Sequence, residues 1–176
     1  LRQIVTGLLD PASLDLRYRI ILFDVRLPDA LIALAVAGAL GLAGIETQTI
    51  LNNPMASPFT LGISSFAAFG ASVAIVLVPQ SALVSQTVAL PVLALVAALV
   101  CGALILLFSR WTGGARESVI LFGMALFFLG NALTSALQYV GSAEAVQQIV
   151  FWTIGNLTKA GWTEFYVVTA CLLLVF

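Results

Sequence analysis

Four polar side chains recur at helical spacing inside an otherwise apolar segment, residues 118–140. They are Asn131, Thr134, Ser135 and Gln138. Their i, i+3, i+4, i+7 pattern would place all four on one stripe of a helix. Amides and hydroxyls are costly to bury in hydrocarbon without partners, so the stripe must face protein or water. We interpret it as the wall of a hydrated pathway, and hydrogen bonding between neighbouring helices remains the alternative.

The sequence offers little other chemistry inside its apolar runs. Glu46 is the only acidic residue well inside one, and it lies about 8 Å of helix rise from the end of that run at Leu51. Its carboxylate is therefore expected to reach the membrane interface rather than to relay protons. There is no His, and Cys101 and Cys171 stand alone in apolar runs. We therefore expect no metal site and no catalytic residues.

The composition excludes a water-soluble domain as the scaffold for these residues. Of the 176 residues, 61% are apolar and 9% are charged, and the mean hydropathy is +1.13. Soluble domains contain roughly 45–50% apolar and about 25% charged residues. The net charge of −1, with no basic run, provides no surface for nucleic acid. The expected fold class is an all-α integral membrane protein, a polytopic helix bundle.

Apolar runs of about 20 residues predict the membrane spans, because this length of helix crosses a hydrocarbon core about 30 Å thick. The predicted spans are residues 30–51, 59–78, 88–108, 118–140 and a truncated 162–176. Residues 1–28 are expected to form an extramembrane segment and residues 29–176 the transmembrane domain. Because the fifth run is too short to cross, we expect an incomplete bundle, an internal piece of a longer polypeptide.

Rows of small residues predict where these helices pack closely, because small side chains let helix backbones approach in a membrane. The rows are Ala33-Ala37-Gly41, Ala67-Ala71, Gly70-Ala74 and Ala94-Ala98-Gly102, each with a spacing of four. They argue for a tightly packed bundle and identify no substrate.

A short helix is predicted between the last two spans, over residues 145–154. The segment is too polar to cross the membrane, and Gly155 and Asn156 are expected to end the helix. Trp152 and Trp162 suit the headgroup zone, where an amphipathic indole is stable. The helix is either an interfacial anchor or a cap over the end of the polar stripe.

Several ordered pieces of the sequence resemble a known family. They are Arg26-Leu27-Pro28, Ala43-Gly44 followed by Gln48, Asn53-Pro54-Met55-Ala56-Ser57-Pro58, Leu61-Gly62-Ile63-Ser64-Ser65, and Trp152-x-x-Gly155 with Trp162. Their order and spacing resemble FecCD-type permeases, the membrane subunits of ABC importers for ferric siderophores, haem and cobalamin. The resemblance runs from about Val25 to the end and covers about spans two to six of a ten-span subunit.

The resemblance implies a multi-pass permease subunit in the cytoplasmic (inner) membrane, with three kinds of protein partner. These are a second permease subunit, identical or different, cytoplasmic ABC ATPase subunits, and an extracytoplasmic solute-binding protein. The chain lacks a G-x-x-x-x-G-K-[ST] motif, so ATP would be hydrolysed by the partner subunits and no cofactor is expected in this chain. The family orientation, with residues 1–28 outside, is opposite to the one that the positive-inside tendency favours.

The implied site residues fall into four groups. Asn131, Thr134, Ser135 and Gln138 would line the translocation pathway; Gln147, Gln148, Trp152, Gly155 and Asn156 would form the outer gate; Arg26 would dock the binding protein; and Asn53, Pro54, Ala56 and Pro58 belong to the cytoplasmic loop motif.

Two positions, Asp29 and Phe66, depart from the family pattern, and Glu46 and Asn52 are also unusual against it. Asp29 stands where the family has a second arginine, so either the partner differs there or Arg17 and Arg19 compensate. Phe66 stands where the family usually has Gly. An ion-gradient-driven secondary transporter is the main alternative function, but it would ordinarily need more ionisable residues within the membrane than Glu46. A purely structural bundle is a further alternative.

Overall fold

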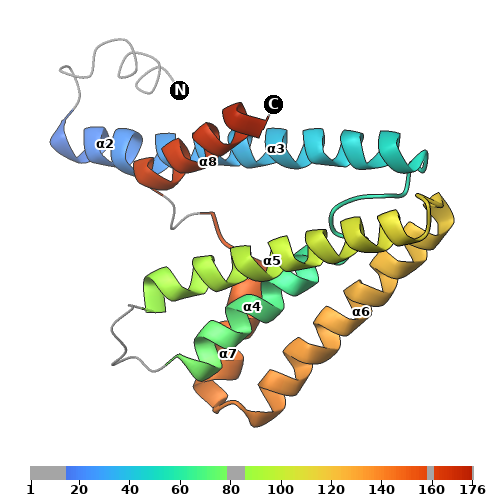
Figure 1. Cartoon of the computed structure of the whole chain (residues 1–176). Helices are drawn as coiled ribbons and strands as arrows, with labels where there is room; N and C mark the ends of the chain where they lie inside the picture. The colour runs from blue at the N-terminus through green and yellow to red at the C-terminus, as the bar shows by residue number, and fades with distance from the viewer. Residues whose placement is uncertain (1–14, 79–85, 158–160, 176) are drawn as a thin grey trace. The chain divides into compact units, whose positions relative to one another are not determined.

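The computed structural model describes residues 15–78, 86–157 and 161–175 (Figure 1). Within these ranges the regular elements are all helical. They are α2 (Leu16–Ile20), the π-helix η2 (Ile21–Arg26), α3 (Leu27–Leu51), α4 (Ile63–Leu77), α5 (Gln86–Trp111), α6 (Arg116–Val140), α7 (Ala143–Ile154) and α8 (Trp162–Val175). The expected all-α class is confirmed.

The chain divides into two compact units. One comprises residues 1–42 and 156–176, and the other comprises residues 43–155. The first therefore contains α2, η2, most of α3, and α8. The second contains the end of α3 together with α4, α5, α6 and α7.

Helix α3 belongs to a helical run that begins well before the predicted start at residue 30. Elements α2, η2 and α3 follow one another directly from Leu16 to Leu51. Pro28 favours a helix boundary in the sequence, because it lacks an N–H. In the structure it lies in the first turn of α3 instead, with its side chain fully buried. Residues 1–14 of the predicted extracytoplasmic segment lie outside the described residues.

Helix α3 ends at Leu51 in a Schellman motif. Asn52 adopts a left-handed conformation with φ 46°. The Asn52 N–H donates to the carbonyl of Thr49 at 3.3 Å, and the Asn53 N–H donates to that of Gln48 at 3.1 Å. These two bonds satisfy carbonyls that a helix end leaves free. The predicted end of this run and the observed end of the helix therefore coincide.

A separate capped turn, residues 57–62, precedes α4. The Ser57 N–H donates to Thr60 Oγ1 at 2.9 Å, and the Thr60 N–H donates to Ser57 Oγ at 3.2 Å. Gly62 closes the turn with φ 86°, a conformation that favours glycine. Helix α4 therefore begins at Ile63 rather than at Phe59, where the sequence places the start of the second span.

Helix α4 is the central element of the unit formed by residues 43–155, where it packs against α5, α6 and α7. Ala71 and Ala74 are almost completely buried. Gly70 lies against α5: a Cβ built there would clash with the carbonyl oxygen of Leu93 and lie 2.7 Å from the Cβ of Ala97. The small residues on this side of α4 thus pack closely, as the sequence predicts.

The core of this unit contains Phe66, a bulky side chain at one of the positions that depart from the family that the sequence resembles. Its ring is buried with Cys101 of α5 and Leu126 of α6. A second buried cluster joins Leu51, Ala56, Leu61 and Val119. The two clusters hold the N-terminal part of α4 and the preceding turn against α5 and α6.

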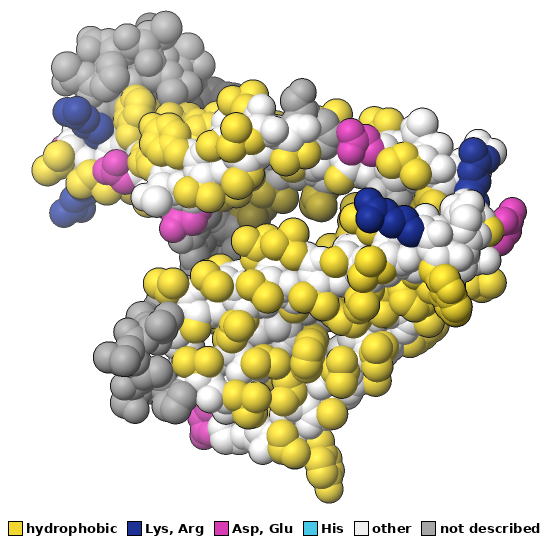
Figure 2. Space-filling model, in the orientation of Figure 1, with side chains coloured by type: hydrophobic (Ala, Val, Ile, Leu, Met, Phe, Trp, Pro, Cys, Tyr) yellow, Lys and Arg dark blue, Asp and Glu magenta, His cyan; other side chains and the backbone are white. Residues whose placement is uncertain are grey.

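Two of the described helices are long and apolar enough to cross a bilayer. They are Val88–Trp111 of α5, with a mean hydropathy of 2.9, and Arg116–Val140, which is α6, with 1.9. Only 17% and 28% of their most apolar windows are buried within this chain. On the visible face of both helices, hydrophobic side chains predominate between the helix ends (Figure 2). These faces are left for lipid or for other protein segments.

Candidate translocation site

A cavity of about 380 Å³ lies among α4, α6 and α7, all within the unit of residues 43–155. Its walls are aromatic and uncharged polar side chains with two small residues. The lining residues are Phe59, Ser64, Ser65, Ala67, Ala68, Phe127, Asn131, Trp152 and Thr153. No charged side chain is among them. Such a surface can hydrogen-bond to a ligand and stack on it without holding it by an ion pair.

Asn131 and Trp152 are the two predicted site residues that the structure brings together. One comes from the polar stripe on α6 and the other from the predicted gate helix, and both line the cavity. The Asn131 side chain is exposed, and its amide Nδ2 donates to the carbonyl of Phe127 at 2.8 Å. This bond uses one amide donor, so the amide oxygen and the second N–H are not used by it.

The rest of the predicted stripe lies outside the cavity lining. Thr134 is 8% exposed, and its hydroxyl donates to the carbonyl of Gly130 in its own helix at 2.9 Å. Gly130 packs against Ser65 of α4, so Thr134 lies next to the α4–α6 contact. Ser135 is exposed and Gln138 is half-buried. The stripe is therefore divided between a helix contact and an open face.

The cavity contains hydroxyl groups that the site prediction missed, namely those of Ser64, Ser65 and Thr153. Ser65 is buried, and its hydroxyl donates to the carbonyl of Gly62 at 2.9 Å. The Thr153 hydroxyl donates to the carbonyl of Ile149 at 2.8 Å. A hydroxyl that donates in this way keeps its oxygen lone pairs as acceptors. The two serines belong to the Leu61–Ser65 piece that carried the family resemblance. Their place in that piece was the one signal in the sequence that could have pointed to them.

Helix α7 starts two residues before the predicted 145, because Ser142 caps it. Ser142 Oγ accepts the Ala145 N–H at 3.2 Å, which satisfies one of the free donors of the first turn. Hydrogen bonds to its own backbone amide and to Ser142 hold the pKa of Glu144 below its ordinary value. Ile149, 1% exposed, anchors the middle of the helix, and α7 packs mainly against α4.

The other predicted gate residues lie on the exposed side of α7 or at its end. Gln147 and Gln148 are exposed, whereas Trp152 is half-buried. Gly155 ends the helix with φ 78°, which favours glycine at this position. Asn156 follows it and belongs to the other unit.

The loop motif between α3 and α4 is built on two local devices. Asn53 Oδ1 accepts the Met55 N–H at 2.9 Å, and the Asn53 carbonyl accepts the Ala56 N–H at 3.1 Å. Ala56 is buried with Leu51 and Leu61. Pro54 is exposed, Pro58 is half-buried, and Met55 is 79% exposed. The motif thus fixes the backbone of a loop and presents two apolar side chains, Pro54 and Met55, outward.

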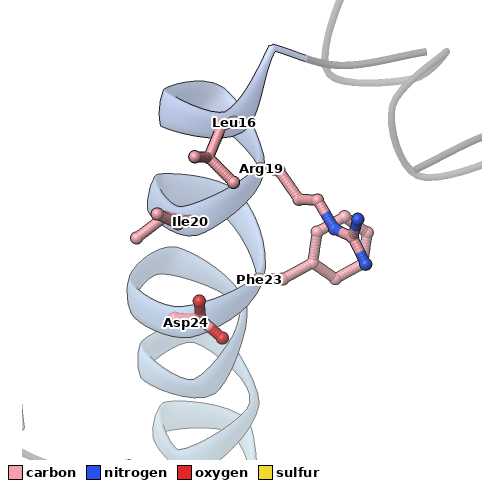
Figure 3. Close-up of a pocket in the computed structure, with 5 residues that line it drawn as sticks. All are labelled: Leu16, Arg19, Ile20, Phe23 and Asp24. Carbon is pink, nitrogen blue, oxygen red and sulfur yellow. The ribbon is translucent and has the colours of Figure 1, made fainter. Parts of the chain in front are cut away.

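The predicted docking arginine lies in the unit of residues 1–42 and 156–176. Arg26 is the last residue of η2 and is exposed, as are Arg17 and Arg19 of α2. A pocket of about 410 Å³ on the same segment is lined by Leu16, Arg19, Ile20, Phe23 and Asp24. Arg19 and Phe23 are four residues apart, and Figure 3 shows both side chains pointing to the same side of the helix. This surface therefore combines basic, acidic and apolar side chains.

The profile of the FecCD transport family matches residues 2–176. This chain belongs to the FecCD transport family. Members are transport permease subunits, and the family fold is a polytopic membrane helix bundle. The FecCD assignment confirms the family that the sequence motifs indicate. It also confirms the expectation of a membrane protein.

Individual relatives agree with the FecCD assignment. A protein of Methanocaldococcus jannaschii assigned as an ABC transporter permease is 33% identical over 97% of this chain and 50% of its own length. The hemin transport system permease of Yersinia pestis is 33% identical over 85% of this chain and 45% of its own. Other relatives are named for iron chelatin in Helicobacter pylori, molybdate in Haemophilus influenzae and vitamin B12 in Salmonella paratyphi A.

A solved structure has the same fold as this FecCD chain. It is assigned to a metal-chelate type ABC transporter in an inward-facing conformation. The match has a TM-score of 0.80 and 31% identity, and it covers 94% of this chain and 51% of the other. The chain spans about half the length of the curated relatives it matches.

Proposed function

We propose that this chain is part of the permease subunit of an ABC importer in the cytoplasmic membrane. The cargo is an iron–siderophore or a related metal chelate such as haem or cobalamin. A second permease subunit completes the pathway, separate ATPase subunits supply the energy, and an extracytoplasmic binding protein delivers the cargo. The chain itself acts as a conduit and holds no cofactor.

The observation that carries the proposal is the uncharged cavity shared by α4, α6 and α7 in a FecCD family member. A bulky chelate must be released after each step of transport. A lining of hydroxyls, an amide and aromatic rings suits this release better than charged groups, which would hold the chelate by ion pairs. Asn131 and Trp152 are the predicted residues at this surface. Ser135 is exposed on the same helix, and we assign it to the pathway as well.

The other predicted residues take supporting roles in the proposal. Thr134 and Gln138 border the pathway, and the Thr134 hydroxyl is bonded within its helix beside the α4–α6 contact. The outer gate consists of Trp152 and four residues near it along the chain, Gln147, Gln148, Gly155 and Asn156. Arg26, assisted by Arg17 and Arg19, meets acidic residues on the binding protein.

The alternative of an ion-gradient-driven transporter is disfavoured by the family assignment. Glu46 is exposed on α3, and it has no role in the proposed mechanism.

Transport by the reconstituted complex tests the proposal. The full-length permease, its ATPase and its binding protein are placed in proteoliposomes, and ATP-driven uptake is measured for a ferric siderophore, haem, cobalamin and molybdate. We expect uptake of one chelate, and an Asn131→Leu variant that loses most of it. Ala132→Leu is the matched control, because Ala132 is exposed next to Asn131 and lies outside the cavity lining.

Two outcomes would contradict the proposal. Uptake that continues without ATP but follows an ion gradient would favour the secondary transporter. Equal uptake by the Asn131→Leu and Ala132→Leu variants would remove the cavity from the pathway while leaving the importer assignment intact.

A further inference from the structure

We propose that Trp162 is a positioning residue for the docking segment, defined as Leu16–Arg26, the helices α2 and η2. Its indole N–H satisfies a helix carbonyl that Pro28 leaves without a donor, and this bond holds the register of the arginines on the segment. The inference rests on the docking role that the proposed function gives to Arg26.

The carbonyl in question is that of Phe23, inside the π-helical turn. In an α-helix it would accept from the N–H of residue 27, and in a π-helix from that of residue 28. The Leu27 N–H instead donates to the carbonyl of Leu22. Pro28 has no N–H. The Phe23 carbonyl therefore accepts from neither residue 27 nor residue 28 of its own helix.

Trp162 provides the missing donor from a distant part of the sequence. Its indole Nε1 lies 3.1 Å from the Phe23 carbonyl oxygen, although the two residues are 139 positions apart along the chain. This is an ordinary N–H···O distance. Leaving a partly buried carbonyl unpaired would lose the bond and keep the desolvation penalty, so the contact favours the π-helical turn.

Contacts other than this hydrogen bond also hold the indole in place. Trp162 is the first residue of α8, and Glu164 Oε2 accepts the Gly161 N–H at 2.7 Å, which is half of a capping box. The Tyr166 ring is stacked on the indole, with ring centroids 5.9 Å apart and planes at 26°. The Phe165 ring contacts it edge-on at 6.0 Å. A donor fixed in this way loses little rotamer freedom on bonding.

The bond matters for docking because a π-helical turn contains one more residue than an α-helical turn. Converting η2 to α-helix would rotate the residues on its N-terminal side by about 100° relative to α3. Arg17 and Arg19 lie on that side, and Arg26 ends the turn itself. Losing the Trp162 bond would therefore change which side of the helix these arginines present to a partner.

A double-mutant cycle on the full-length transporter in lipid nanodiscs tests the inference. The variants are Trp162→Phe, which keeps an aromatic ring but removes the N–H, Pro28→Ala, which restores a backbone donor, and the pair combined. Trp111→Phe is the matched control, because Trp111 is 84% exposed. The readouts are hydrogen exchange of the amides in residues 21–27 and the affinity of the purified binding protein.

We expect Trp162→Phe to speed exchange in residues 21–27 and to weaken docking by about five-fold, the size of one neutral hydrogen bond. In the Pro28→Ala background the same substitution should have little further effect on either readout, because the introduced alanine provides a helical donor. Trp111→Phe should match the wild type. In the unmodified protein, the Trp162 indole proton should exchange more slowly than that of Trp111, a measurement that needs no variant.

Wild-type exchange and docking in Trp162→Phe would overturn the inference, as would effects of equal size in the Pro28→Ala background. Faster exchange with unchanged docking would also overturn it, because the turn would then not position the arginines. If the binding protein fails to dock on the wild type, the proposed function fails instead, and the exchange data decide alone whether Trp162 holds the turn.

Discussion

The indole N–H of Trp162 donates to the carbonyl of Phe23 at 3.1 Å. Phe23 lies just before the Arg26-Leu27-Pro28 piece of the family pattern, and Trp162 is another piece of the same pattern. One hydrogen bond thus links two parts of a signature that lie far apart along the chain. The spacing of the pattern alone gives no reason for this link, but the missing N–H of Pro28 does.

The Gly130→Ala substitution should destabilise the contact between α4 and α6. A Cβ at this position would lie 2.6 Å from Ser65 Oγ and 2.9 Å from the Ser65 carbonyl carbon. The Ser65 backbone would have to shift as well as its side chain, so we expect a loss of about 1–3 kcal/mol in the free energy of unfolding. Thermal unfolding of the full-length protein in detergent measures the change.

Gly102→Ala is the matched control for this substitution. Gly102 ends one of the predicted rows of small residues, but no atom lies within 4 Å of a Cβ built there in the described part of the chain, so the predicted close contact is not found at this position. We expect unchanged or slightly higher stability, by at most about 1 kcal/mol, from the better helix propensity of Ala. Equal destabilisation by both variants would contradict the packing explanation.

The Gly62→Ala substitution should be more harmful than an alanine at Gly113. Both glycines have positive φ, 86° and 66°, so both substitutions add left-handed strain of roughly 1–2 kcal/mol. A Cβ at Gly62 would also lie 2.7 Å from the Phe127 N of α6, whereas Gly113 has open space. The difference between the two unfolding free energies measures the crowding alone, and no difference would mean that α6 can move aside.

The ends of several helices could be predicted from the sequence because they depend on local chemistry. The end of α3 at Leu51 follows from the two asparagines and the proline after it. The start of α4 could not be predicted in the same way, since residues 57–62 form a turn with its own caps and only Gly62 separates it from the helix. Hydropathy alone joins that turn to the helix.

The candidate site was predicted in part, for a geometric reason. The periodicity of α6 places Asn131 and Thr134 on one stripe, but it does not give the rotation of the helix relative to α4. In the structure the edge of the helix contact runs through the stripe, so Thr134 is buried and Asn131 reaches the cavity. Phe59 reaches it from a turn, and Ser64 from the start of α4, and the placement of both depends on tertiary packing.

Acid should loosen the N-terminus of α7 through Glu144. Its hydrogen bonds, to its own backbone amide first and then to Ser142, lower its pKa from the ordinary 4.5. A lowered pKa in the folded state means that the stabilisation is fully present above the ordinary pKa and is lost as the pH falls through the lowered value. Hydrogen exchange of residues 143–148 should therefore rise below about pH 4.5, and a Glu144→Gln variant should lack that pH dependence. A variant as pH-dependent as the wild type would assign the effect to another group.

Trp152→Ala should widen the cavity and make the reconstituted importer leak. Trp152 is the largest side chain of α7 in the cavity wall, and it is half-buried there. Its removal deletes a wall of the proposed outer gate, so we expect chelate to pass at a measurable rate without ATP. Efflux of a preloaded chelate from proteoliposomes measures the leak. Phe151→Ala is the control, because Phe151 is 64% exposed on the neighbouring position of α7 and outside the lining. Tight vesicles with Trp152→Ala, or an equal leak with Phe151→Ala, would show that the cavity wall does not act as the gate.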